Sequence, residues 1–168
     1  MRQMMRLHII CGALLIGFCA HAQQKTPQPK TQTVKLKVPP LPPSTDAAMT
    51  AQLADAKWTP AEKLEPRFPA GAQVALIGAD PMSTGITAYM RLKPGYKLPK
   101  HAHTHMSWLT MLAGKGTWTI DGKRTPSTVG TFVIIASKQA HEFACDAGAE
   151  CVFLLRRSGP TDYIWPGK

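Results

Sequence analysis

Three histidines stand at alternate positions in the segment PGYKLPKHAHTHMSWLTMLAG, which covers residues 94–114. They are His101, His103 and His105, and a fourth histidine, His141, begins a later apolar segment. Imidazole is the commonest metal-binding side chain near neutral pH. Alternate side chains of a strand share one face, so two histidines from one strand and one from a neighbour can converge on a single cation. The spacing therefore predicts a metal site.

Three further side chains lie close enough in the sequence to be considered as ligands. His105 has the same parity as the two histidines before it and is a candidate fourth ligand. Glu142 follows His141 directly, so strand alternation turns its carboxylate to the opposite face. Cys145 shares the face of His141, but four residues along a strand span about 13 Å, which is too far for a shared ion. A cluster of core or surface histidines without any ligand is the alternative interpretation.

The elements that position these residues are predicted to be strands. From about residue 70 the sequence consists of short apolar segments between turn residues, and no long helical pattern interrupts them. Seven short strands of this kind predict an all-β sandwich or barrel. Asp121-Gly122 is a strong hairpin turn signal, and Trp118 and Phe132 are expected in the core. The predicted strands cover residues 73–78, 85–93, 107–114, 115–123, 130–137, 141–145 and 151–157.

The strand that follows the first histidines has one apolar face. Ser107, Leu109 and Met111 share the parity of the ligand face. Leucine and methionine beside a metal would line a mostly apolar pocket. Trp108 has the opposite parity and faces away from that pocket. It could pack outside the barrel, under the N-terminal helix or at a subunit interface, or it could be an ordinary core residue.

The spacing of these residues resembles the two sequence motifs of the cupin family. The first motif reads Gly, five residues, His-x-His, three or four residues, Glu, six residues, Gly, and here the matching positions are Gly95, His101, His103, Ser107 and Gly114. The second reads Gly, five residues, Pro-x-Gly, two residues, His, three residues, Asn, and here the matching positions are Gly130, Ala136, Lys138, His141 and Cys145. The resemblance covers roughly residues 70 to 165.

The resemblance implies a fold and a ligand set. The fold is a small jelly-roll β-barrel of the cupin type with a short N-terminal helix. The ligands are His101, His103 and His141, which would hold a divalent transition metal, namely iron, manganese, nickel, copper or zinc. The glutamate ligand of the family is Ser107 in this sequence, so the site would be one unit more positive and its metal preference should change.

Two classes of function follow from the resemblance and remain open. In the first, the protein is an exported metalloenzyme for a small molecule, with dioxygenase-like or isomerase-like chemistry. In the second, it is a non-catalytic cupin that binds a small ligand or a metal for sensing, storage or assembly. Retention of three histidines favours the first class, and Ser107 favours the second. Cupins commonly pair through edge strands and terminal arms, so a homodimer is compatible with the resemblance.

The N-terminus predicts export. A basic start with Arg2 and Arg6, a short apolar run and the pattern Ala20-His21-Ala22 are typical of a secretory signal peptide over residues 1–22. An uncleaved membrane anchor would need a longer apolar run. A lipoprotein anchor at Cys19 is disfavoured by the bulky Phe18 before it. We therefore expect a periplasmic or secreted protein with no stable membrane insertion after cleavage.

The remaining chain divides by composition. Residues 23–43 are rich in Pro, Lys, Gln and Thr and predict an extended linker. Residues 44–69 begin with capping residues and Ala-rich helix formers, which predict a short helix and a lead-in. Residues 70–168 form the predicted barrel domain.

The charge of the chain does not indicate a nucleic-acid partner. Loss of Arg2 and Arg6 with the leader lowers the formal net charge from +10 to +8. Such a basic chain could bind nucleic acid, but an exported protein seldom meets it and no basic-aromatic motif is present. We expect a small-molecule partner and a weakly anion-attracting surface.

Two cysteines remain after cleavage, in the sequence CDAGAEC. Asp146-Ala147-Gly148-Ala149 is typical of a turn, so Cys145 and Cys151 could face each other across a hairpin. An exported protein can keep such a disulfide. Two free thiols would instead require a reducing compartment.

Overall fold

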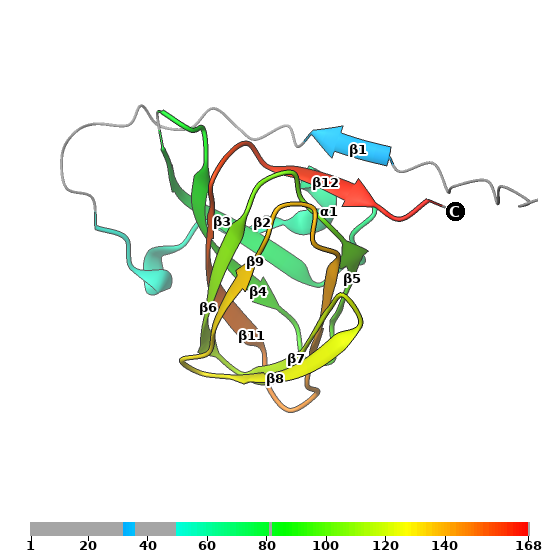
Figure 1. Cartoon of the computed structure of the whole chain (residues 1–168). Helices are drawn as coiled ribbons and strands as arrows, with labels where there is room; N and C mark the ends of the chain where they lie inside the picture. The colour runs from blue at the N-terminus through cyan, green and yellow to red at the C-terminus, as the bar shows by residue number, and fades with distance from the viewer. Residues whose placement is uncertain (1–31, 36–49, 81, 168) are drawn as a thin grey trace, which may run out of the picture.

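The computed structural model describes residues 32–35, 50–80 and 82–167, and these form an all-β domain of antiparallel strands (Figure 1). One sheet has six strands in the order β2-β3-β4-β11-β6-β9, with bounds β2 Thr59–Pro60, β3 Ala72–Ala79, β4 Ile86–Leu92, β11 Cys151–Arg157, β6 Ser107–Ala113 and β9 Phe132–Ile135. The second has four strands in the order β5-β10-β7-β8, with bounds β5 Lys97–His101, β10 His141–Cys145, β7 Lys115–Ile120 and β8 Lys123–Thr128. A third, two-stranded sheet pairs β1 Gln32–Lys35 with β12 Asp162–Trp165.

Alternation of apolar and polar side chains builds the two large sheets. Buried and half-buried residues alternate along all of β4, and Ser107, Leu109 and Met111 of β6 are buried as their parity predicts. The buried side chains of both sheets form one hydrophobic core that includes Trp118 and Phe143. The jelly-roll expectation for the fold is therefore confirmed.

Each of the seven predicted strands corresponds to a strand of the structure, although several bounds differ. The turn at Asp121-Gly122 joins β7 to β8, and both residues have positive φ, 48° and 82°. These are the signs that a two-residue hairpin turn of type I′ requires. Of the strands not predicted, β5 carries His101 and β12 lies across from Ala102, to which its Ile164 is bridged.

The N-terminal region differs from the sequence expectation. The predicted helix begins at residue 44, and its part before residue 50 lies outside the described residues. The described part contains only a single 3-10 turn, η1 (Leu53–Asp55), and the short helix α1 (Ala61–Leu64) comes later. Within the predicted linker, residues 32–35 form β1 because β12 offers a free edge for pairing. None of the helices described is long and apolar enough to cross a membrane.

Two aromatic residues lie on the outside of the barrel. Phe132 is 57% exposed, so its predicted core role is wrong. The reason is that β9 is the last strand of its sheet and turns Phe132 and Ile134 outward, whereas Ile135 is buried. Trp108 is half-buried on the outer face of β6, and the guanidinium of Arg156 lies 5.6 Å from its ring centroid.

Cys145 and Cys151 form a disulfide bond with a Cα–Cα distance of 5.9 Å. Cys145 ends β10 of the four-stranded sheet and Cys151 begins β11 of the six-stranded sheet. The bond therefore does not close a paired hairpin, as the sequence suggested, but ties one sheet to the other across the turn between them. Both cysteines are buried at the edge of the core.

Replacing Cys145 and Cys151 together by serine should lower the free energy of unfolding by about 2 kcal/mol, because the open loop gains entropy in the unfolded chain. Urea denaturation of the oxidised protein and of the double variant measures this difference. Reduction of the native protein should lower its stability by a similar amount and leave the variant unchanged. Equal stability of the oxidised and reduced native protein would contradict the role given to this bond.

Candidate metal centre

Two of the three histidines are placed by direct strand pairing. His101 is the last residue of β5 and His141 is the first residue of β10, and the two are cross-strand partners in the antiparallel ladder. Their ring centroids are 4.3 Å apart. Opposed residues on one face of an antiparallel pair have adjacent side chains, so the register alone brings these imidazoles together.

His103 joins the pair from just beyond β5. A bridge between Ala102 and Ile164 of β12 keeps the chain extended there, so His103 lies on the same side as His101. One ring nitrogen from each of His101, His103 and His141 lies within 4.8 Å of the other two, and all three residues are buried. Within the part of the chain that the structure describes, these three side chains lie close enough together to hold a metal ion.

His105 is not brought into this cluster. Its ring lies directly against the backbone of Gly159, because a Cβ atom placed on that glycine would be only 2.4 Å from Nδ1 of His105. The strand parity that suggested a fourth ligand does not extend to His105, since β5 ends at His101 and the chain bends before β6 begins. The structure thus separates His105 from the other three histidines.

Backbone carbonyl groups fix the tautomer of every histidine in the cluster. Nδ1 of His101 lies 2.6 Å from the carbonyl oxygen of Pro99, and Nδ1 of His141 lies 2.9 Å from that of Gln139. Nδ1 of His103 lies 2.5 Å from the carbonyl oxygen of Asp162. A carbonyl oxygen can only accept, so each Nδ1 carries the proton and each Nε2 presents a lone pair. Metal-binding histidines are oriented by hydrogen bonds of this kind.

Burial keeps the three imidazoles neutral. Desolvation lowers the pKa of His101 and of His103 well below the ordinary value, with neighbouring His141 and Arg157 adding to the effect. Desolvation also lowers the pKa of His141, to about 4. Neutral imidazole is the form that binds a metal ion. Near neutral pH the three imidazoles therefore have the protonation state that a metal ligand needs.

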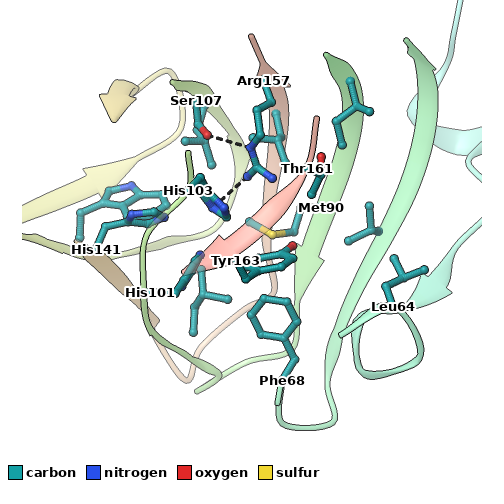
Figure 2. A pocket seen from close by; sticks show the side chains of 16 residues that line it. Leu64, Phe68, Met90, His101, His103, Ser107, His141, Arg157, Thr161 and Tyr163 are labelled. Atoms are coloured by element: carbon teal, nitrogen blue, oxygen red, sulfur yellow. Dashed lines mark hydrogen bonds between the residues drawn. The ribbon is translucent and has the colours of Figure 1, made fainter. Parts of the chain in front are cut away.

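The same pocket contains a cationic side chain that the sequence pattern did not predict. Arg157, the last residue of β11, is only 4% exposed. Its Nε donates a hydrogen bond to Oγ of Ser107 at 3.1 Å, and its Nη2 donates one to Nε2 of His103 at 2.9 Å (Figure 2). The signal was present in the alternation of β11, which places Phe153, Leu155 and Arg157 on one buried face.

The cluster forms one wall of a cavity of about 50 Å³ (Figure 2). Apart from the histidines, its polar lining comprises Ser107, Arg157, Thr161 and Tyr163, and most of the rest is aliphatic or aromatic. Leu109 lines it as predicted, whereas Met111 of the same strand face is buried in the core and does not line it. Trp118, a core residue as predicted, also lines the cavity. Among the described residues no aspartate or glutamate lines this cavity. Its chemistry is therefore that of neutral imidazoles, one guanidinium and an apolar wall.

The turn before His141 keeps a left-handed backbone conformation at Lys138, where the second motif has glycine. The N–H of Gln139 donates to the carbonyl of Ala136, and the carbonyl of Gln139 in turn accepts from His141. Lys138, which stands where the motif has glycine, has φ of 61° within this turn. Glycine adopts that left-handed conformation without steric cost, whereas a lysine there costs about 1 kcal/mol.

The donor set fits a transition metal in number and type. Three imidazole nitrogens are typical ligands of zinc, copper, iron and nickel. Nitrogens that share one ion at about 2.0–2.1 Å lie closer together than the cluster does now, so the rings would have to move inward slightly. His103 would also have to give up its hydrogen bond to Arg157, because one lone pair cannot serve both.

The chain matches one family model, described as Cupin domain, over residues 88–155. That range contains His101, His103 and His141 and ends just before Arg157. No curated protein is significantly similar in sequence.

Solved structures with the same fold are numerous. A cupin-2 domain from Rhodospirillum rubrum has a TM-score of 0.59 at 16% identity, covering 76% of this chain and 86% of its own. A predicted oxalate decarboxylase from Thermotoga maritima has a TM-score of 0.57 at 17% identity, covering 66% and 98%. The polyketide cyclase RemF from Streptomyces resistomycificus has a TM-score of 0.56 at 15% identity, covering 70% and 84%. At these identities the likeness is one of fold.

The metal-free protein should lose stability as the pH falls from about 6.5 towards 4. Over this range histidines of the unfolded chain take up protons, while the buried ones, exemplified by His141 with a pKa of about 4, do not. Each such histidine contributes up to about 1.4 kcal/mol per pH unit. Urea denaturation in the presence of a chelator measures the profile, and His141→Asn should make it shallower. A flat profile would contradict the buried, neutral state.

Proposed function

We propose that this chain is a member of the cupin superfamily and that it binds a divalent transition metal through His101, His103 and His141, beside a pocket for a small molecule. The observation that carries the proposal is that one ring nitrogen from each of three buried histidines lies within 4.8 Å of the other two. Each ring is oriented by a backbone hydrogen bond at Nδ1, which leaves the lone pair at Nε2. Metal-binding histidines are oriented in this way.

A bound metal would supply Lewis acidity to an oxygen atom of the ligand. The protein contributes the remaining features of the site. The histidines stay neutral through burial, Ser107 and Arg157 form its polar edge, and the apolar wall excludes water. An enzyme for a small molecule, with dioxygenase-like or isomerase-like chemistry, is the activity that such a site supports best.

A non-catalytic ligand-binding cupin is the second candidate, and one contact favours it. Arg157 donates a hydrogen bond to the lone pair of His103 that a metal would need. Ser107 leaves the site without a carboxylate that would offset part of the positive charge of Arg157 and a divalent ion. A guanidinium next to a dication is repulsive, and the low dielectric of a buried site strengthens that repulsion. If this repulsion dominates, the histidines and Arg157 together would bind an uncharged or anionic small molecule without any metal.

Metal content separates these candidates. The full chain, purified and reconstituted in turn with iron, manganese, nickel, copper and zinc, should retain about one ion by elemental analysis. His101→Ala and His103→Ala should lose it, because two imidazoles in an apolar pocket bind weakly. His105→Ala is the matched control and should retain it, since His105 lies outside the cluster. Absence of every metal after reconstitution would refute the metal proposal and leave the second candidate.

We also propose that the protein works outside the cytoplasm, in the periplasm or beyond the cell. The disulfide between Cys145 and Cys151 supports this, because such bonds persist in oxidising compartments. The signal-peptide pattern of residues 1–22 supports it independently. Cell fractionation should recover the chain from the exported fraction, with an N-terminus near Gln23. Recovery of the uncleaved chain from the cytoplasm would contradict export.

A further inference from the structure

The guanidinium of Arg157 has hydrogen-bonding capacity that the protein does not use. Its Nε and Nη2 donate to Ser107 and His103, but Nη1 is buried and has no hydrogen-bond partner among the described residues. A buried donor without a partner costs about 1–3 kcal/mol, and more for a charged group. A hydrogen-bond acceptor that enters the pocket and binds Nη1 would therefore remove this cost.

No carboxylate of the pocket balances this charge. Burial lowers the pKa of Arg157 and the charge of the Asp162 carboxylate opposes this effect, but the hydrogen bonds of that carboxylate come from the backbone N–H and the hydroxyl of Thr104. Asp162 is not among the residues that line the cavity, and none of the lining residues described is acidic. A buried charge is normally paired, since transfer from water to an apolar site is expensive. Arg157 is hydrogen-bonded here to a hydroxyl and an imidazole, its guanidinium lies 6.0 Å from the ring centroid of Tyr163, and the charge of Asp162 acts on it only from outside the cavity lining.

A second unpartnered group faces the same cavity. Thr161 is 5% exposed, and its Oγ1 has no hydrogen-bond partner among the described residues. Figure 2 shows Thr161 and Arg157 directed into the pocket on the side away from His101 and His141. A hydroxyl beside a guanidinium gives a set of donors suited to an acceptor with two oxygens.

We propose that this pocket binds a small monocarboxylate with an apolar body, with its carboxylate on Arg157 and Thr161. The rest of the wall fits the body, because Phe68, Met90, Leu98 and Leu155 offer only apolar surface. The cavity of about 50 Å³ admits about three to five water-sized groups at about 10–15 Å³ each, so it accepts an acid as short as acetate or propionate. A phosphate, with up to two charges and more oxygens, would find too few donors.

The ligand class also deepens the proposed metal function, and this part rests on that function. A metal on Nε2 of His103 would free Nη2 of Arg157, so that Nη1 and Nη2 could each donate one N–H to the two oxygens of a carboxylate. The metal would further add positive charge to a site that has no acidic lining. Carboxylate and metal should therefore each increase the affinity of the other, by the same factor.

Calorimetric titration of the full chain tests the carboxylate site directly. Acetate and propionate are the probes, with propionamide as the neutral analogue and inorganic phosphate as the competing anion. The metal-free protein should bind propionate about four-fold more tightly than acetate, because of its additional methylene. Thr161→Val and Arg157→Gln should weaken propionate binding at least about ten-fold. Arg156→Gln is the matched control, because Arg156 lies on the outer face over Trp108 and should leave affinity unchanged.

The outcomes separate this inference from the metal proposal. Propionate binding without any metal would uphold the carboxylate site even if reconstitution fails. Propionamide binding as tightly as propionate, or phosphate binding in place of carboxylates, would overturn it. If Arg157→Gln does not fold, as judged by its melting transition, Arg157→Lys and Thr161→Val decide the matter. Full propionate affinity in both would refute the assignment.

Discussion

Three hydrogen bonds from histidine Nδ1 groups to backbone carbonyl oxygens determine what the pocket can bind. A carbonyl accepts and never donates, so each bond fixes one tautomer and leaves one lone pair at Nε2. The carbonyls belong to three separate parts of the fold, namely β5, the turn before β10 and the start of β12. The packing of two sheets and a terminal strand therefore sets the direction of three ring nitrogens. Any change in that packing would change the ligand geometry.

The electrostatics of the pocket come from the absence of acidic side chains in its described lining. Burial makes the histidines neutral, and Arg157 retains its proton because a guanidinium does so in proteins. A carboxylate at position 107 would neutralise Arg157 and attract a metal, whereas Ser107 accepts only a single hydrogen bond from Nε. With serine at position 107, the guanidinium of Arg157 therefore keeps its capacity to bind an anion.

Local pattern predicted the parts of the fold that local physics determines. Strand alternation placed β4 and β6 correctly, and the cysteine spacing and turn residues predicted the bond between Cys145 and Cys151. The histidine cluster followed from parity because β5 and β10 are neighbours in register. Long-range pairing was invisible, so β1 and β12 were missed. Arg157 was overlooked because an arginine at the end of an apolar strand is usually solvated.

The hydrogen bond between His103 and Asp162 joins residues that are 59 positions apart in the chain. During synthesis His103 emerges long before its carbonyl partner, and until β12 has formed its imidazole can exchange tautomers freely. The complete set of oriented histidines is thus a late product of folding rather than a property of the nascent chain. A metal ion that needs all three histidines would therefore be bound only in the compartment where the last strand docks.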